Sequence, residues 1–446
     1  MKKGFFIKTL GCKVNQVESV FIGEALGSAG FFPSSPKEAS LLILNSCVVT
    51  EKAEAECRKI LKKWAKLPAR YLVLAGCYSQ RFAKEAKAWA EKQGIKNLLI
   101  LGHQEKLKLP EILKKLEQTH SPKFPVVMVG KLPEKGPCEV LLLKSFPSHS
   151  RAFVKVQDGC NRFCSYCIVP FTRGAPRSVP PELVLKQIEL FVQAGYEEFV
   201  ITGIHLGKWG KDLSPRQKLI NLLEAIEKLL SSFKKTFHLR LSSIEVKELD
   251  KELLDFFKSS KFIVPHFHIP LQSGSNRILK LMGRDYTREE YLVILKRLHD
   301  IFPSATFGAD VMVGFPTETE EDFEETYKLI SNSPLNWLHI FSFSPRPGTK
   351  AWDMKPKVNP EEIKKRYQAL KRLFVKKRKE FLENQKGKVV SAVLEKSSNK
   401  GWKALSENYI TLYVKGLPEN PELKGKLVKV KLVEITEELH FISYPV

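Results

Sequence analysis

The sequence predicts an α/β protein built in three parts. Residues 1–130 alternate apolar, strand-like runs with amphipathic helical stretches at about 30 residues per unit, which is typical of a parallel sheet. Residues 146–358 repeat a strand–helix pattern six times, and residues 386–446 carry short strand-like runs separated by turn residues. These patterns predict an N-terminal parallel α/β domain, a central (βα)6 domain and a small C-terminal β-barrel.

Each strand-like run in the first part ends close to a cysteine. The runs cover residues 5–10, 40–45 and 70–75, and helical patterns near residues 16–30 and 52–66 separate them. The cysteines that follow the runs are Cys12, Cys47 and Cys77. Because the carboxyl ends of parallel strands lie along one edge of a sheet, where ligands bind, we expect these thiols to converge on a metal cluster. The alternative is three independent structural cysteines.

A linker rich in proline and glycine is expected at about residues 130–150, from Pro133, Gly136, Pro137 and Pro147. Cys138 lies in this linker, and Cys57 lies inside a predicted helix. Neither follows a strand, so we expect both to be non-ligands.

The central part contains six strand-like runs separated mostly by helical patterns. The runs cover residues 153–157, 199–203, 237–242, 266–271, 306–314 and 338–343. The helical patterns cover residues 182–194, 218–230, 248–258, 288–302 and 320–330. Six such units are fewer than the eight of a closed barrel.

Directly after the first of these runs come three closely spaced cysteines, Cys160, Cys164 and Cys167, in a C-x3-C-x2-C pattern. Three thiolates bind three irons of a [4Fe–4S] cube and leave the fourth open to a ligand from outside the protein. That opening indicates a reactive cluster rather than an electron-transfer cluster. A zinc site is the alternative, but only Cys164 and Cys167 form a C-x2-C pair and no histidine follows at finger spacing.

Polar residues and glycines gather at the carboxyl ends of the central strands, where barrel sites form. The candidate cofactor-binding residues there are Gly203, Arg240, Ser242, Glu245, Gln272, Gly314 and Glu318. His266 and His268 share one face of a strand, and we expect them to be satisfied structural histidines rather than metal ligands. Arg173, after the cysteine run, either orients a ligand or forms a structural ion pair.

Residues 360–388 form a strongly basic, amphipathic helical stretch, whose charges serve either as a solvated face or as RNA contacts. Strand-like runs follow at residues 389–395, 409–414, 427–435 and 441–444. The whole chain has a net charge of +24, which favours a polyanionic partner, most simply nucleic acid. The alternative is a lysine-rich composition without such a partner.

The chain of 446 residues is long enough for several domains, with 43% hydrophobic and 27% charged residues. No apolar run reaches the roughly 18 residues of a membrane span. Lys8 interrupts the apolar run near the N-terminus, so we expect a strand there and not a leader. We expect a monomeric, cytoplasmic protein with reduced thiols and no membrane contact.

The cysteine run resembles the signature of radical S-adenosylmethionine (SAM) enzymes, and the longer string from Arg151 to Gly174 resembles their methylthiotransferase branch. The resemblance implies two [4Fe–4S] clusters, with SAM on the open iron of the second, and an open six-unit partial TIM barrel whose strand-end residues contact SAM. It also implies that SAM serves both as methyl donor and as source of a 5′-deoxyadenosyl radical. Gly387, Leu394-Glu395, Asn408-Tyr409 and Gly425-Lys426 resemble the RNA-binding TRAM module.

Within this family the strings Thr9–Gln16, Gln157–Cys160, Arg173–Pro180 and Gly203–Gly207 are most similar to the branch that acts on threonylcarbamoyladenosine in tRNA. The resemblance therefore implies methylthiolation of carbon 2 of that nucleoside, beside the anticodon, with the anticodon stem-loop as partner. Two alternatives are a methylthiotransferase for isopentenyladenosine and a non-catalytic RNA-binding protein stabilised by metal. The sequence identifies neither the sulfur donor nor the electron donor.

Overall fold

The computed structural model describes the chain except for residues 1–2, 119–122, 135, 137 and 148, so Pro137 of the expected linker lies outside the described residues. The chain divides into two compact units. Unit 1 comprises Met1–Leu143, Asp158–Arg177 and Ser344–Trp352, and unit 2 comprises Lys144–Gln157, Ser178–Phe343 and Asp353–Val446. Within the described chain, no helix combines the length and apolar character needed to cross a bilayer.

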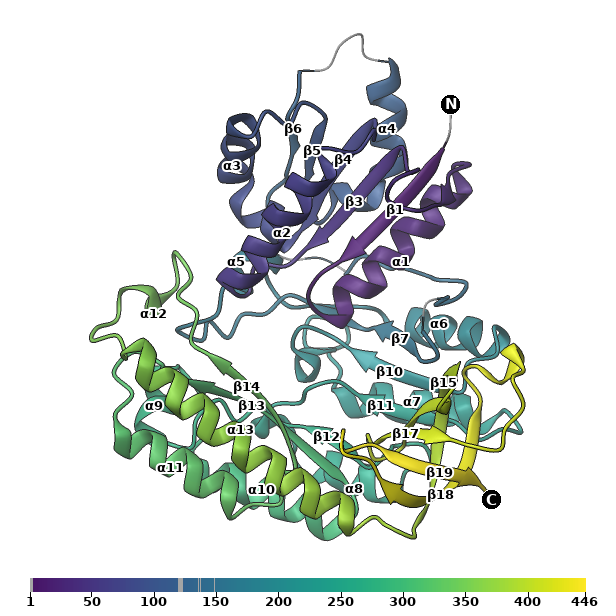
Figure 1. Cartoon of the computed structure of the whole chain (residues 1–446), viewed down its shortest axis with the longest axis vertical. Coiled ribbons are helices and arrows are strands. Elements are labelled where there is room, and N and C mark those ends of the chain that lie inside the picture. Colours follow the sequence, from purple (N-terminus) through teal and green to yellow (C-terminus); the bar gives the residue numbers. More distant parts are fainter. Residues whose placement is uncertain (1–2, 119–122, 135, 137, 148) are drawn as a thin grey trace. The chain divides into compact units, whose positions relative to one another are not determined.

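Unit 1 is built on one parallel sheet, as the sequence predicts. Its strands are β1 (Gly4–Thr9), β2 (Phe32–Pro33), β3 (Leu41–Ser46), β4 (Tyr71–Gly76), β5 (Leu98–Leu101) and β6 (Val126–Met128), in the order β2-β1-β3-β4-β5-β6. All neighbouring strands run parallel. Its helices include α1 (Lys13–Ser28), α2 (Glu51–Trp64), α3 (Cys77–Lys92), η1 (Glu105–Lys108), α4 (Leu109–Gln118) and α5 (Pro170–Arg173) (Figure 1).

Side chains of the central strands point alternately to the two faces of this sheet, and both faces are apolar. Helices therefore cover both faces. Leu42, Leu44, Leu72 and Leu74 pack with residues of α2 and α3 in one core. The residues between them, such as Ile43 and Val73, pack with α1 and α4 in the other. Burial on both faces fixes the register of the sheet, since a one-residue slip would exchange the two surfaces.

The loop with the closely spaced cysteines belongs to unit 1, although it follows the first strand of the central domain in sequence. Ile168 packs into the core formed by α2 and α3. The guanidinium of Arg81 lies 5.6 Å from the ring centre of Phe171. These contacts group the loop with unit 1 in space, and the domain ranges expected from the sequence stay a prediction.

The central part of unit 2 has six main strands in two sheets of three. The strands are β7 (Ala152–Lys155), β10 (Glu198–Thr202), β11 (His238–Leu241), β12 (His266–His268), β13 (Thr306–Val313) and β14 (Trp337–Ser342), in the orders β11-β10-β7 and β12-β13-β14. A parallel bridge between Leu239 and Ile263 links the two sheets. The six strands therefore follow one another in chain order, as expected for a six-unit partial barrel (Figure 1).

Helices follow most of these strands. They are α6 (Pro181–Gln193), η2 (Leu206–Lys208), α7 (Leu219–Ser231), η3 (Val246–Glu248), α8 (Lys251–Ser259), α9 (Asn276–Leu281), α10 (Arg288–Ile301), α11 (Glu320–Ser331) and α13 (Pro360–Glu383). Helix α12 (Lys350–Asp353) lies almost entirely in the segment Ser344–Trp352 of unit 1. Short strands β8 (Gln157–Asp158) and β9 (Arg177–Ser178) flank the cysteine loop.

Side chains of β12 and β13 alternate between the helical layer and the inner face of the partial barrel. Phe267 and Phe307 face the helices, because their ring centres lie 5.0 Å and 5.9 Å from those of Phe302 and His299 at the end of α10. Successive side chains of a strand point to opposite faces. His266, His268 and Asp310 therefore lie on the inner face.

The C-terminal residues form a closed barrel of five strands. A small barrel agrees with the sequence prediction, but β16 is not among the four predicted strand-like runs. Its strands are β15 (Val389–Ser398), β16 (Gly401–Ser406), β17 (Thr411–Val414), β18 (Leu427–Ile435) and β19 (Phe441–Pro445), with η4 (Pro421–Leu423) between two of them. Phe381 and Leu382 of α13 complete its apolar core.

The turn between β16 and β17 covers the amino-terminal ends of β12 and β13. The ring of Tyr409 stacks on that of His266 with 4.0 Å between ring centres. The Thr306 hydroxyl, at the start of β13, donates to the carbonyl of Asn408 at 2.6 Å. The inner face at this end is thus filled by protein, which leaves the carboxyl ends of the strands as the place for a ligand.

Candidate metal centre and cofactor site

Three neighbouring strands of unit 1 deliver the three separated cysteines to one edge of the sheet. Cys12, Cys47 and Cys77 come just after β1, β3 and β4, which are adjacent in the sheet. Gly11 precedes Cys12 and Gly76 precedes Cys77, and each glycine has a φ of +96°. A Cβ on Gly11 would lie 3.1 Å from the sulfur of Cys47. The backbone at Cys12 therefore passes against Cys47, as the predicted convergence requires.

The thiols also interact electrostatically. The pKa of Cys77 is raised to about 11, mainly by burial; Arg173 lowers it, whereas Cys47 and Cys12 raise it. Burial raises the pKa of Cys47 as well, and Cys12 adds to that increase. Ionisation of Cys47 and Cys77 is thus disfavoured both by burial and by neighbouring thiols, and a bound cation or metal cluster would relieve this because it stabilises thiolates.

The two cysteines expected to be non-ligands do not follow strands of this sheet directly. Cys57 is fully buried in α2, where its thiol lies 3.7 Å from the carbonyl of Cys47 and burial raises its pKa to about 12. Cys138 is buried, with its sulfur within 4.8 Å of carboxylate oxygens of Glu139 and Asp158. Their exclusion from the ligand set stays a prediction.

The cysteine loop folds back on itself around Cys160, Cys164 and Cys167. The Cys160 N–H donates to the carbonyl of Gly174 at 3.0 Å, and the Cys167 N–H donates to the carbonyl of Cys164 at 2.9 Å. Cys164 is buried, whereas Cys160 and Cys167 are half-buried. The loop is thus closed at its base and presents its thiols from a short, constrained backbone.

Arg173 joins this loop to the first cysteine set through buried ion pairs. Its guanidinium lies 2.7 Å from Glu18 and 3.0 Å from Asp158, and the side chains of all three are at most 5% exposed. Burial alone would lower the pKa of Arg173, but Asp158 and Glu18, followed by Cys77 and Cys12, raise it well above its ordinary value. Of the two roles considered for Arg173, the described contacts support the structural ion pair.

A second buried cation, Lys106 of η1, completes this network. Its Nζ lies 2.6 Å from Glu18 and donates to the Asn45 side chain at 3.2 Å. Both Arg173 and Lys106 lower the pKa of Cys77. The network therefore sets two positive charges beside the first cysteine set, where they stabilise thiolates and the anionic clusters that thiolates hold.

The donor set fits iron–sulfur clusters. Unit 1 holds both triplets, Cys12, Cys47 and Cys77 and Cys160, Cys164 and Cys167, and thiolates are the ligands that such clusters require. Each triplet supplies three thiols, which leaves one iron of each cube to another ligand. The assignment of these six residues as ligands remains the interpretation made from the sequence.

The residues predicted to contact SAM divide into two kinds. The Ser242 hydroxyl and the Gln272 side-chain oxygen are buried without a hydrogen-bond partner among the described residues. Gln272 has a φ of +65°, and its backbone binds β13 through Asp310 and Met312. An unsatisfied buried polar atom at a strand end is costly, so both are suited to a polar ligand.

Other residues of that set already have protein partners. Glu245 pairs with Arg284, and Glu318 accepts from Arg366 and from the N–H of Gly314, both at 2.8 Å. Burial raises the pKa of Glu318 despite these hydrogen bonds. Gly314 has a φ of +76° and lies against Ile363, and Gly203 lies against the side chain of Gln157. For these four, a direct contact with SAM stays a prediction.

Arg240 points its guanidinium into a buried ion pair with Glu198, at 2.8 Å, and donates to the carbonyls of Ser406 and Glu407. These contacts place Arg240 beside the turn that fills the amino-terminal end of the inner face. These protein contacts account for the burial of Arg240. The described contacts do not test its predicted contact with SAM, which stays a prediction.

This ion pair predicts an acid-dependent loss of stability. Burial raises the pKa of Glu198, but Arg240 and His238 lower it to about 2, below its ordinary value of 4.5. The stabilisation is therefore complete above about pH 4.5 and is lost as the pH falls toward 2. We expect Glu198→Gln to flatten the pH dependence of the urea midpoint between pH 5 and pH 3, measured on the iron-free protein. An unchanged slope would contradict the assignment.

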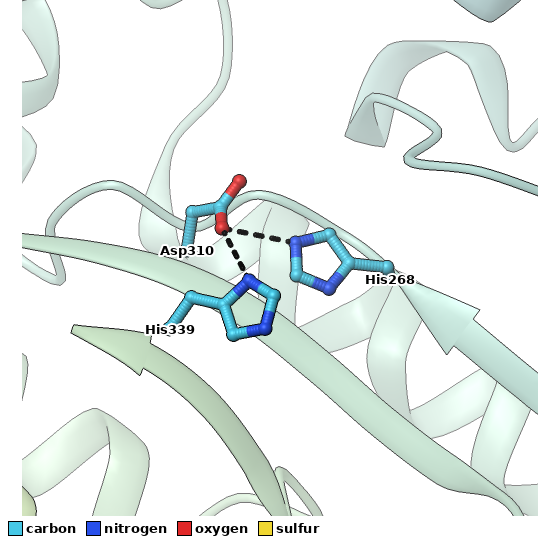
Figure 2. Close-up of side chains that lie close together, drawn as sticks. All are labelled: His268, Asp310 and His339. Atoms are coloured by element: carbon cyan, nitrogen blue, oxygen red, sulfur yellow. Dashed lines mark ion pairs between the residues drawn. The ribbon is translucent and has the colours of Figure 1, made fainter. Parts of the chain in front are cut away.

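The sequence interpretation missed one group on the inner face. His268, Asp310 and His339 come from β12, β13 and β14, and Figure 2 shows both imidazoles directed at one carboxylate oxygen. Alternation along the strands could have placed His268 and Asp310 on one face, but their contact depends on the register between strands far apart in sequence.

Comparison with known proteins agrees with this geometry. Residues 154–330 match the Radical SAM superfamily, and residues 4–97 match the uncharacterised protein family UPF0004. The chain is 38% identical over 433 residues to "Threonylcarbamoyladenosine tRNA methylthiotransferase MtaB" of Aquifex aeolicus, covering 96% of this chain and all of that protein. It is 35% identical to "tRNA-2-methylthio-N(6)-dimethylallyladenosine synthase" of Carboxydothermus hydrogenoformans, with 97% of each chain covered.

Among solved structures, the fold is similar to the radical SAM methyltransferase TsrM from Kitasatospora setae, with a TM-score of 0.58 at 14% identity over 78% of this chain and 75% of that chain. The cobalamin-dependent radical SAM enzyme OxsB gives a TM-score of 0.53 over 84% of this chain and 56% of that chain. These likenesses concern the fold alone. From the full-length relatives and the two cysteine triplets, the chain belongs to the radical SAM methylthiotransferase family, in the branch of its MtaB-type relatives.

Proposed function

We propose that this enzyme attaches a methylthio group to carbon 2 of N6-threonylcarbamoyladenosine beside the anticodon of tRNA. The observation that carries the proposal is the full-length similarity to the Aquifex aeolicus relative named as a threonylcarbamoyladenosine tRNA methylthiotransferase. The placement of both cysteine triplets in one compact unit supports it, because the reaction needs a site that cleaves SAM and a site that holds sulfur.

The two triplets have separate roles in this proposal. Cys160, Cys164 and Cys167 would hold a cluster with an open iron for SAM, and Cys12, Cys47 and Cys77 would hold a second cluster. The first would supply reducing chemistry at SAM, and the second would supply a place for sulfur. The protein orients the reactants: Ser242 and Gln272 offer buried polar atoms to SAM, and Arg173 and Lys106 compensate negative charge beside Cys77.

The RNA partner is supported by charge. The chain carries +24, and α13 exposes a row of basic side chains. These residues are Lys364, Lys365, Lys371, Arg372, Lys376 and Lys379. By contrast, Arg366 and Arg378 of the same helix are buried and bind protein groups. Such a divided helix offers its exposed side to phosphates. The C-terminal barrel is the proposed RNA-binding module, and the cytoplasm is the proposed location.

Nucleoside analysis tests the proposal directly. In tRNA from a strain that lacks the gene, we expect mass spectrometry to show loss of 2-methylthio-N6-threonylcarbamoyladenosine and accumulation of its unmethylthiolated precursor. Complementation with the intact gene should restore the product. Unchanged levels of the methylthiolated nucleoside in the deletion strain would reject this substrate.

A second candidate substrate is N6-dimethylallyladenosine, the nucleoside called isopentenyladenosine above. The Carboxydothermus hydrogenoformans relative, whose name contains the 2-methylthio derivative of this nucleoside, is 35% identical over almost its whole length. The same nucleoside analysis decides between them. Loss of the 2-methylthio derivative of dimethylallyladenosine, with the threonylcarbamoyl derivative retained, would establish this alternative.

A further inference from the structure

The inner face of unit 2 carries a connected polar group, His268, Asp310 and His339. His268 Nε2 lies 3.2 Å from Asp310 Oδ1, and His339 Nδ1 lies 3.3 Å from the same oxygen. Asp310 and His339 are direct partners in the pairing of β13 with β14. Gly308 faces His268, and a Cβ there would lie 2.8 Å from the ring, so the glycine provides the space that the imidazole occupies.

This group is open to ligands. The exposed fraction of the side chain rises from 10% for His268 to 27% for Asp310 and 58% for His339. Figure 2 shows the second oxygen of Asp310 directed away from both imidazoles. An acceptor oxygen held on a strand, accessible and not aimed at its neighbours, is what a hydrogen-bonding ligand site needs.

Trp337 fixes the direction of the hydrogen bonds. Its indole N–H donates to His339 Nε2 at 3.1 Å. An indole nitrogen can only donate, so Nε2 accepts and the ring proton of neutral His339 lies on Nδ1, from which it is donated to Asp310. Burial raises the pKa of Asp310, but hydrogen bonds from His268 and His339 lower it well below its ordinary range. Asp310 is thus an ionised acceptor.

The direction of the hydrogen bond from Trp337 to His339 argues against a metal ion at this group. Two histidines and a carboxylate with ligand atoms within 4.8 Å resemble a metal site. A neutral histidine that binds metal through Nδ1 carries its proton on Nε2, where it would face the N–H of Trp337. Two donors would then oppose each other. The group is therefore better suited to accept hydrogen bonds from an organic ligand.

We propose that Asp310, held in place by His268 and His339, accepts hydrogen bonds from the substituent on N6 of the substrate adenosine and so selects threonylcarbamoyl over dimethylallyl. This inference rests on the proposed function. A threonylcarbamoyl group has a hydroxyl and urea N–H groups to donate, whereas dimethylallyl is a hydrocarbon. The threonyl carboxylate is repelled by Asp310, which turns it outward and fixes the orientation of the substituent.

A polar site rejects an apolar substituent strongly, because the substituent covers the acceptor, which then loses its water without gaining a hydrogen-bond donor. An apolar pocket, by contrast, rejects a polar substituent only weakly. Asp310 therefore gives this chain a physical means to separate two substrates that otherwise share the adenosine, the anticodon loop and the reacting carbon.

The test compares two anticodon stem-loop RNAs, one with N6-threonylcarbamoyladenosine and one with N6-dimethylallyladenosine, on the iron-loaded full chain. The readouts are the ratio of kcat/KM values and the ratio of Kd values from fluorescence anisotropy. In Asp310→Asn, the amide oxygen takes the place between the histidines and the amide N–H₂ faces the ligand. We expect the preference for threonylcarbamoyl to fall about 10- to 100-fold in both ratios.

A matched pair at His339 tests the positioning role on an exposed residue whose replacement does not threaten folding. His339→Asn keeps a donor near the position of Nδ1 and should retain most of the preference, whereas His339→Leu removes it and should lower the preference. Glu252→Gln is the control, since it breaks an exposed pair with Lys218, at 2.7 Å, to which no binding or catalytic role is assigned. It should leave both ratios at the wild-type value.

The outcomes separate this inference from the proposed function. If the wild-type enzyme does not methylthiolate the threonylcarbamoyl loop, the proposed function fails. If it does, and both Asp310→Asn and His339→Leu keep the wild-type ratios, only the role of Asp310 fails. A zinc ion bound stoichiometrically by the wild type and lost in His339→Leu, measured after adding Zn²⁺ alone, would overturn the inference in favour of a metal site.

Discussion

Replacing Arg173 by methionine is expected to destabilise unit 1 by about 3–5 kcal/mol, the usual effect of removing one partner from a buried ion pair. The substitution leaves Glu18 and Asp158 with less charge compensation in a region where their side chains are 3% and 5% exposed. It also removes the donor to Asn15, next to the first cysteine set. Lys106 still compensates the charge of Glu18, so the loss of charge compensation should mainly affect Asp158 and the cysteine loop that contains it.

The measurement is the free energy of unfolding from urea titration of the iron-free protein, followed by a fluorescence probe in unit 1. Arg70→Gln is the matched control, because Arg70 pairs with Glu117 at 3.0 Å on the surface, with both side chains at least 40% exposed. That pair should contribute at most about 1 kcal/mol. Equal effects of the two substitutions would show that burial of the Arg173 network does not contribute to stability.

The double variant Arg173→Met with Asp158→Asn sharpens the test. Removing the uncompensated carboxylate should restore part of the stability lost in the single variant, because contacting residues are not additive. A ligand-orienting Arg173 without a structural role would show additive effects.

The sequence predicted the strand-end cysteines well because the relevant signal is local. An apolar run followed at once by a glycine or serine and a cysteine reports both the strand and its end, and parallel topology then brings Cys12, Cys47 and Cys77 together. The six central strands were found for the same reason, within a few residues of their observed bounds.

The sequence did not predict features that depend on packing between distant segments. The cysteine loop groups with unit 1 through Ile168, which packs into the core formed by α2 and α3, and through Arg173, whose partner Glu18 lies 155 residues earlier. Strand β5 and helix α3 were not expected, although both are needed to bury the sheet. Arg240 lies at the end of a predicted barrel strand, yet it donates to the carbonyls of Ser406 and Glu407 in the C-terminal barrel, more than 160 residues away.

Replacing Cys164 by alanine is expected to abolish reductive cleavage of SAM and to halve the iron content, from about eight to about four atoms per chain. Cys164 is the buried member of its triplet, and without it the cube would retain only two protein ligands. The first triplet, Cys12, Cys47 and Cys77, does not include this residue, so its cluster should still assemble. Iron analysis and release of 5′-deoxyadenosine on anaerobic reduction measure the two effects.

Cys47→Ala provides the reciprocal case, with about four irons remaining, cleavage of SAM retained and methylthiolation lost. Cys57→Ala is the control, because this thiol is buried in α2 and lies ten residues from Cys47, against its carbonyl. It should keep about eight irons and full activity. Loss of iron in Cys57→Ala would mean that the ligand set was assigned wrongly. Cleavage of SAM by Cys164→Ala at the wild-type rate would remove the basis for separate roles, since only an open, thiolate-held iron in the loop gives SAM a place to bind and be reduced.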